Sequence, residues 1–142
     1  MANLFIDRGN LGDSPELKHV QRPDGSSFTV ATMRVRFSRW KQTDSGEIEQ
    51  VGGFWRTVEI YGRKAEDCAT HLRKGARVLV LGRVEEFQVK DEAGNPVEVY
   101  KIVAQEIAPL LSRVESISFI SARARPEADA TEADADAHSA IA

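Results

Sequence analysis

The chain has 142 residues, enough for one ordinary domain and a tail but too few for two full domains. Hydrophobic residues make up 42% and charged residues 29%, so the chain can bury a core, and its single cysteine excludes an internal disulfide. The net charge of −3 is uneven, because residues 1–113 carry 17 Lys and Arg against 16 Asp and Glu, whereas residues 114–142 carry 2 against 6. Such an asymmetry favours a nucleic-acid partner.

Short strands separated by turn signals fill the first half of the chain. A strand is predicted around residues 3–11, and a Pro-Asp-Gly turn at 23–25 separates it from a second strand at 27–40. In the second strand apolar and polar side chains alternate, in the order Met33, Arg34, Val35, Arg36, Phe37 and Ser38. One face of this strand is therefore apolar and the other basic. Phe28 and Val30 fall on the opposite parity, which predicts a bulge near Ala31.

The second half of the folded region begins with a third alternating strand at 54–61 and then changes its period. Ala65, Cys68, Ala69 and Leu72 recur at helical spacing, which predicts a short amphipathic helix ended by Gly75. A continuous apolar strand at 78–81 leads to Gly82, where a barrel strand can turn a corner, and residues 97–107 supply the last strand. Five strands with one helix between the third and fourth predict an all-β Greek-key barrel of the OB type.

The C-terminal segment differs in composition from the barrel. Residues 113–142 are rich in Ala, Asp, Glu and Ser, and beyond residue 120 they contain no aromatic residue. Low hydrophobicity and net negative charge predict an acidic, largely disordered tail after a folded domain at 1–112, although Val114, Ile117 and Phe119 favour a docked segment or an interface. No apolar run approaches the roughly 20 residues of a membrane span, and the start of the chain lacks a signal-peptide pattern, so we expect a cytoplasmic protein.

The sharpest functional signal is a surface that combines aromatic rings with arginines. If the second and third strands pair, their outward faces share one surface, which carries Arg34, Arg36, Ser38, Trp40, Trp55, Thr57, Glu59 and Tyr61. Cations bind phosphates and flat rings stack on unpaired bases, so this mixture predicts binding of single-stranded nucleic acid. The competing interpretation is that these rings pack under a loop or in a subunit interface.

Further candidates extend this surface. Phe87 is a candidate stacking residue, with core packing as the alternative, and Arg56, Arg63 and Lys74 are candidate phosphate contacts. No constellation for catalysis is visible, because the three histidines lack a metal-ligand spacing and Cys68 falls on the apolar stripe of the helix. We therefore expect neither an enzyme nor a metal or other cofactor.

Several short motifs, in order along residues 3–110, resemble bacterial single-stranded DNA-binding proteins. They are Gly9-Asn10-Leu11-Gly12, Ser14-Pro15-Glu16-Leu17, the run from Phe54-Trp55-Arg56-Thr57 to Tyr61-Gly62, Ala65-Glu66 and Leu72-Arg73-Lys74-Gly75. The resemblance implies an OB fold, usually a homotetramer, that wraps single-stranded DNA during replication, repair and recombination. It also implies stacking roles for Trp55 and Tyr61, for Trp40 at the end of the second strand, and for Phe87 or its neighbour Val89.

Three departures from that family's pattern leave a second hypothesis open. Glu59 lies on the presumed DNA face, and Glu85 and Glu86 occupy a stretch that is usually basic, so each opposes phosphate. The tail is acidic, as family tails that bind replication or repair proteins are, but it ends in Ser139-Ala140-Ile141-Ala142 rather than in Pro-Phe. These departures predict a divergent or accessory member, from a plasmid or another mobile element. The alternative is an OB-fold adaptor that holds a protein partner and has little affinity for DNA.

Overall fold

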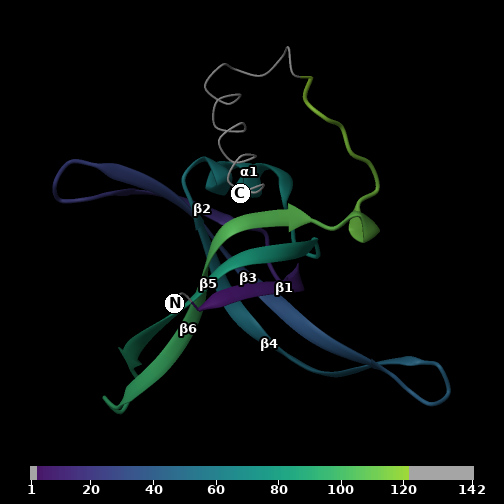
Figure 1. The fold of residues 1–142 in the computed structure, drawn as a ribbon. Helices are drawn as coiled ribbons and strands as arrows, with labels where there is room; N and C mark the ends of the chain where they lie inside the picture. Colours follow the sequence, from purple (N-terminus) through teal and green to yellow (C-terminus); the bar gives the residue numbers. More distant parts are fainter. Residues whose placement is uncertain (1–2, 122–142) are drawn as a thin grey trace.

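The computed structural model describes residues 3–121 (Figure 1). In chain order the elements are β1 (Leu4–Leu11), β2 (Glu16–Gln21), β3 (Ser27–Gln42), β4 (Ile48–Tyr61), α1 (Arg63–His71), β5 (Arg77–Lys90), β6 (Pro96–Pro109) and a 3-10 turn, η1 (Leu111–Arg113). The strands are long and the connections between them short, so most backbone hydrogen bonds lie in the sheet.

The strand order of the sheet is β1-β5-β6-β4-β3-β2, and an additional pairing of β1 with β3 closes it into a barrel. On one side β1 pairs with β5, and on the other its last residues, Asn10 and Leu11, pair with Arg36 and Val35 of β3. All neighbouring strands are antiparallel except β4 and β6, which run parallel. The predicted OB-type barrel is confirmed: five strands close it, and β2 extends the sheet beyond β3.

The core consists of the inward-facing side chains of these strands. In β3 the apolar parity of the sequence is buried, with Met33, Val35 and Phe37 at 2% exposure or less. Val58 and Ile60 of β4 and Val78 and Val80 of β5 belong to the same cluster. Its other buried members are Leu11, Ala31, Ala65, Cys68, Leu72, Ile102 and Ala104. Apolar burial of this kind is the main stabilising contribution to a small barrel.

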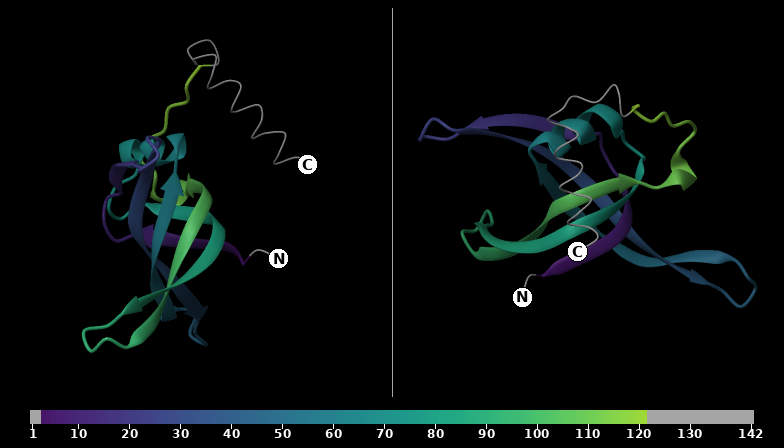
Figure 2. Two further views of the ribbon diagram at one scale, coloured as in Figure 1. Left: turned by 90° about the vertical axis from the view of Figure 1, so that its left-hand side faces the viewer. Right: turned by 45° about the horizontal axis from the view of Figure 1, so that its top comes forward.

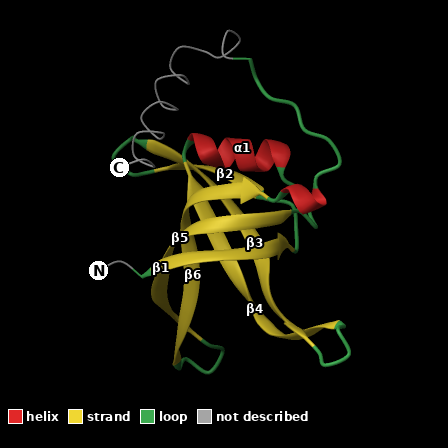
Figure 3. Cartoon of the chain, turned by 45° about the vertical axis from the view of Figure 1, so that its right-hand side comes forward, coloured by secondary structure: helices red, strands yellow, loops and turns green. Residues whose placement is uncertain are grey.

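The one α-helix among residues 3–121, α1, covers one end of the barrel (Figure 3). Ala65 and Cys68 of α1 are buried, and Leu72, the residue that ends the helix, is buried beside them. Away from this end, the β3–β4 and β5–β6 hairpins leave the barrel as two diverging arms (Figure 2). The outer face of the sheet between these arms is therefore left open by the helix.

Two sequence-based expectations differ from the structure in detail. The strand β2 was not expected, because only Leu17 and Val20 interrupt its polar sequence, and it forms by pairing with β3 from Ser27 to Thr32. The expected bulge near Ala31 is wrong, since β3 pairs with β4 without a break there and the register shifts between Arg39 and Trp40 instead. Phe28 and Val30 keep regular alternation and lie on the outer face, where the Tyr61 ring approaches Phe28.

Candidate nucleic-acid interface

The pairing of β3 with β4 brings the predicted aromatic and basic residues onto one outer face of the barrel. Arg36 lies opposite Trp55 and Arg34 opposite Thr57, and side chains at opposed positions of paired strands point to the same side. The aromatic residues Trp40, Trp55, Tyr61 and Phe87 are 54%, 43%, 43% and 40% exposed. They are therefore accessible and not sealed inside the barrel of this chain. We call this surface, with Arg34 and Arg36, the aromatic face.

Several contacts on the aromatic face fix the position of Trp55. Its six-membered ring lies against Gly12, where a Cβ atom would approach within 2.5 Å. The Gly12 N–H donates a hydrogen bond of 2.8 Å to the Arg34 carbonyl, so this contact is tied to β3. The guanidinium groups of Arg34 and Arg36 lie 5.8 and 6.0 Å from the indole, within cation–π range. Arg34 also donates to Thr57 Oγ1 at 3.2 Å.

Tyr61 marks the end of the face that lies nearer to α1. Its ring lies 5.9 Å from that of Phe28, and its hydroxyl donates to Glu59 Oε1 at 3.0 Å. Partial burial and the neighbouring Glu59 carboxylate both raise the pKa of the phenol above its ordinary value. The hydroxyl is therefore neutral at physiological pH and acts as a donor, while the ring remains half exposed.

Across β4, the aromatic face continues onto β6 and β5. Lys101 of β6 lies beside Thr57 and opposite Glu85, and its ammonium is 5.5 Å from the centre of the Phe87 ring. Phe87 itself lies opposite Val99. The predicted surface thus extends without interruption from β3 to β5.

Trp40 lies at the other end of the aromatic face, on the β3–β4 arm. It follows the register shift and pairs with Gln50, which leaves Val51 as the extra residue of β4. The Gln50 amide lies 3.4 Å from Ser38 Oγ, so the outer face continues across the shift. Trp40 is therefore on the expected face but on a projecting arm, farther from the barrel than Trp55.

Three predicted phosphate contacts are not brought onto this face. Arg56 points to the opposite side of β4, where its guanidinium lies 4.7 Å from the Phe54 ring and 5.6 Å from the Tyr100 ring. Arg63 is exposed at the first position of α1, two residues after Tyr61, and is next to the end of the face. Lys74 lies in the loop before β5, where its backbone N–H donates to Ser14 Oγ at 3.1 Å.

The match to a known family decides what kind of surface this is. Residues 2–110 match the model of the single-strand binding protein family, which covers the whole barrel. The chain belongs to the single-strand binding protein family. Proteins of this family bind DNA and catalyse no reaction, so the prediction that the chain is not an enzyme is confirmed, as is the family resemblance of its sequence motifs.

Solved structures show the same fold at low sequence identity. A small single-stranded DNA-binding protein from Streptomyces coelicolor is similar with a TM-score of 0.66 at 18% identity, over 80% of this chain and 98% of that one. A Plasmodium falciparum protein of the family, solved with single-stranded DNA, gives 0.59 at 21% identity, over 78% and 96%. A deletion mutant of the Thermus aquaticus protein gives 0.57 at 24% identity, over 80% and 52%. At these identities the comparison supports the OB fold alone.

Two residues of this single-strand binding family member contact side chains of the aromatic face, and the sequence pattern does not predict these contacts. Lys101 was overlooked because its place depends on the parallel pairing of β4 with β6, which leaves no local pattern. Gly12 belongs to one of the family motifs, and its lack of a side chain lets the edge of the Trp55 ring lie against the backbone. A glycine next to a predicted strand is a signal for close approach of another group, although it does not identify that group.

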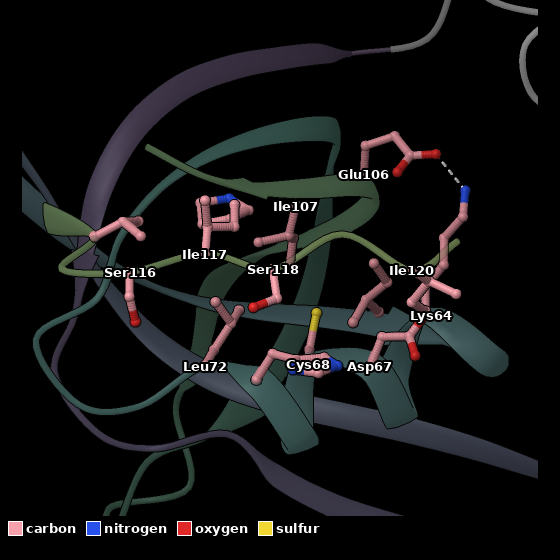
Figure 4. Close-up of a pocket in the computed structure, with 14 residues that line it drawn as sticks. Lys64, Asp67, Cys68, Leu72, Glu106, Ile107, Ser116, Ile117, Ser118 and Ile120 are labelled. Atoms are coloured by element: carbon pink, nitrogen blue, oxygen red, sulfur yellow. Dashed lines mark hydrogen bonds and ion pairs between the residues drawn. The ribbon is translucent and has the colours of Figure 1, made fainter. Parts of the chain in front are cut away.

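A separate apolar pocket lies away from the aromatic face, between α1, the end of β6 and residues 114–120 (Figure 4). Its volume is about 620 Å³, and Val114, Ile117 and Ile120 line its outer side, although Ile117 and Ile120 remain 52% and 76% exposed. Burial raises the pKa of the Cys68 thiol there to about 11, and the thiol stays protonated at neutral pH. Among residues 3–121 no group of three or more His, Cys, Asp or Glu could hold a metal ion. The acidic residues from 127 onward lie outside the described residues.

Proposed function

We propose that this protein binds single-stranded DNA without sequence preference through the aromatic face, and so protects it during replication, recombination or repair. The observation that carries the proposal is the exposure of four aromatic rings beside Arg34 and Arg36 on one continuous side of the sheet. Every base has a π-face, so stacking on these rings tolerates any sequence. Duplex DNA would offer them no free base faces.

The arrangement around Trp55 suggests how a strand is held. The ring is already fixed against Gly12 before a base arrives, so little side-chain freedom is lost on stacking. Arg34 and Arg36 both lie on β3 beside the ring and can contact phosphates next to the stacked base. Each stacked base contributes on the order of 1–3 kcal/mol. Trp55 is therefore the proposed anchor, with Tyr61, Phe87 and Trp40 as further stacking positions.

We also propose that the protein is a cytoplasmic homo-oligomer, with the tetramer implied by the family resemblance. Leu4 and Ile6 of β1 are 68% and 58% exposed, an unusual amount for neighbouring apolar residues on one side of a strand. From Leu4 to Gly9, β1 pairs with β5 alone within the described residues, so its second edge is open to another chain.

No helix of residues 3–121 is long and apolar enough to cross a membrane. The acidic tail is the proposed contact with replication or repair proteins.

The competing adaptor function rests on the carboxylates Glu59, Glu85 and Glu86. Two of them are paired with cations, since Lys101 lies 3.0 Å from Glu59 and Arg83 lies 3.4 Å from Glu85. Their negative charge therefore opposes phosphate less than the sequence suggests, which favours DNA binding over the adaptor.

Intrinsic tryptophan fluorescence during titration with dT oligomers separates the two functions. Stacking on Trp55 and Trp40 predicts strong saturable quenching, and a matched duplex of equal length should quench weakly. An adaptor predicts a flat trace with both DNAs, which would overturn the proposal.

A further inference from the structure

Glu59 lies on the aromatic face between Thr57 and Tyr61 of β4, and its carboxylate contacts two side chains of the face at once. The Lys101 ammonium and the Tyr61 hydroxyl each lie 3.0 Å from the same carboxylate oxygen, Oε1. These three residues come from two parallel strands, β4 and β6. The side chains of Lys101 and Glu59 are only 28% and 20% exposed, so the pair is more shielded from water than an ordinary surface ion pair.

This contact removes Lys101 from the cations that are free to bind phosphate. The hydrogen bond from Lys101 to Glu59 is the main reason that the pKa of the ammonium is raised, so Lys101 stays charged at neutral pH and forms an ion pair with Glu59. A phosphate that took Lys101 would leave the Glu59 carboxylate with an uncompensated charge in a half-buried place, which is costly. In contrast, no acidic side chain lies within ion-pair distance of Arg34 or Arg36 among the described ion pairs.

The same contact determines which groups a ligand meets between the Tyr61 and Phe87 rings. Lys101 lies between Glu59 and the Phe87 ring, and Glu59 fixes the Tyr61 hydroxyl. Glu85, which lies opposite Lys101, is paired with Arg83, so the region between the Tyr61 and Phe87 rings holds two ion pairs and is electrically neutral overall. The positive charge is concentrated beside Trp55 on β3. Bases suit the first region and phosphates suit the second.

We propose that Glu59 is a positioning residue that keeps Lys101 from phosphate, so that the DNA backbone follows the Arg34 and Arg36 side of the face and bases cover the region between Tyr61 and Phe87. This inference rests on the proposed single-strand binding and specifies its geometry. It reverses the simple expectation that Glu59 only weakens binding, because the carboxylate also sets how many phosphates are neutralised.

The salt dependence of binding counts those phosphates directly. For single strands, the slope of log affinity against log salt concentration changes by about 0.7 for each phosphate that is neutralised. Glu59→Gln keeps an acceptor for Tyr61 but releases Lys101, so the slope measured with a fluorescent dT oligomer should become steeper by about 0.7. The double variant Glu59→Gln/Lys101→Gln should return to the slope of the unmodified protein.

A matched control separates this effect from a general change of charge. Glu86→Gln makes the same change of charge on β5, but Glu86 alternates with Glu85 and Phe87 and so points away from the aromatic face. Its slope should stay unchanged. An unchanged slope for Glu59→Gln, or an equal increase for Glu86→Gln, overturns the inference.

Lys101→Gln tests the same point if Glu59→Gln does not fold. An unchanged slope supports the inference, and a slope that is shallower by about 0.7 overturns it. Failure of the unmodified protein to bind dT at any salt concentration would instead refute the proposed function, so the two failures are distinguishable.

Discussion

At the scale of single residues, Gly12 links the backbone of the barrel to the position of one aromatic ring. A methyl group at this position would come within 2.5 and 2.7 Å of two Trp55 ring atoms, and the ring is rigid, so it must move as a whole. Gly12→Ala should therefore displace Trp55 and weaken binding to dT oligomers, while the melting temperature changes little because the ring is half exposed. Affinity and thermal unfolding measured together check this. Unchanged affinity would show that the position of the ring does not matter.

The second residue-scale prediction concerns the pKa of Tyr61. Burial is the largest cause of its raised value, and the hydrogen bond and negative charge of Glu59 add to it, with Glu85 raising it and Lys101 lowering it. Glu59→Gln removes the charge and should bring the pKa down toward the ordinary phenol value of about 10. Titration of ring-labelled tyrosine by NMR measures this pKa directly. A pKa that stays the same would mean that Glu59 does not hold the hydroxyl.

At the scale of elements, Gly82 allows β5 to pass close to β6. The pairing register shifts between Leu81 and Gly82, and a Cβ atom there would lie 2.3 Å from the Val103 carbonyl oxygen and 2.8 Å from Ala104 Cα. Backbone atoms cannot move aside as a flexible side chain can. Gly82→Ala should therefore lower the free energy of unfolding by roughly 1–3 kcal/mol, as over-packing does in cores. Urea unfolding measures this, and a variant with unchanged stability would contradict the tight packing seen here.

The strands that could be predicted from sequence are those with a strong alternation of apolar and polar residues. Met33, Val35 and Phe37 show this pattern, and their burial follows from it. The strand β2 lacks the pattern, because its partner β3 supplies the hydrogen bonds and little of β2 is buried. The sequence predicts a bulge near Ala31 because an apolar residue at position 30 interrupts the alternation of apolar and polar side chains. In the structure the alternation continues, and Val30 lies opposite Tyr61 on the outer face, where it is nevertheless buried.

At the scale of the whole molecule, the candidate site is less predictable than the fold, because it depends on long-range register. Alternation of apolar and polar residues predicts that Trp55 and the arginines of β3 share one outer face, and the pairing of β3 with β4 brings them together there, with Arg36 opposite Trp55. Arg56 was grouped with Trp55 although adjacent strand residues point to opposite sides, and it lies between Phe54 and Tyr100. The Lys101–Glu59 pair needed the parallel contact between β4 and β6, which no local signal encodes.

Self-association is the prediction that belongs to the whole molecule. If the open edge of β1 and the exposed Ile6 form an interface between copies, Ile6→Glu should reduce the mass measured by light scattering. Ile48→Glu is the matched control, because Ile48 is 72% exposed at the start of β4 on a projecting arm. An equal mass for the unmodified protein and Ile6→Glu would rule out this edge as the interface.

The affinity of Trp55→Ala for a dT oligomer tests the stacking account most directly. Loss of one stacked base should weaken binding by about 5- to 150-fold, which corresponds to roughly 1–3 kcal/mol, with the fold intact by circular dichroism. Phe119→Ala, which removes an exposed ring far along the chain from the barrel strands, should bind as the unmodified protein does. Unchanged affinity in a folded Trp55→Ala variant would contradict the account.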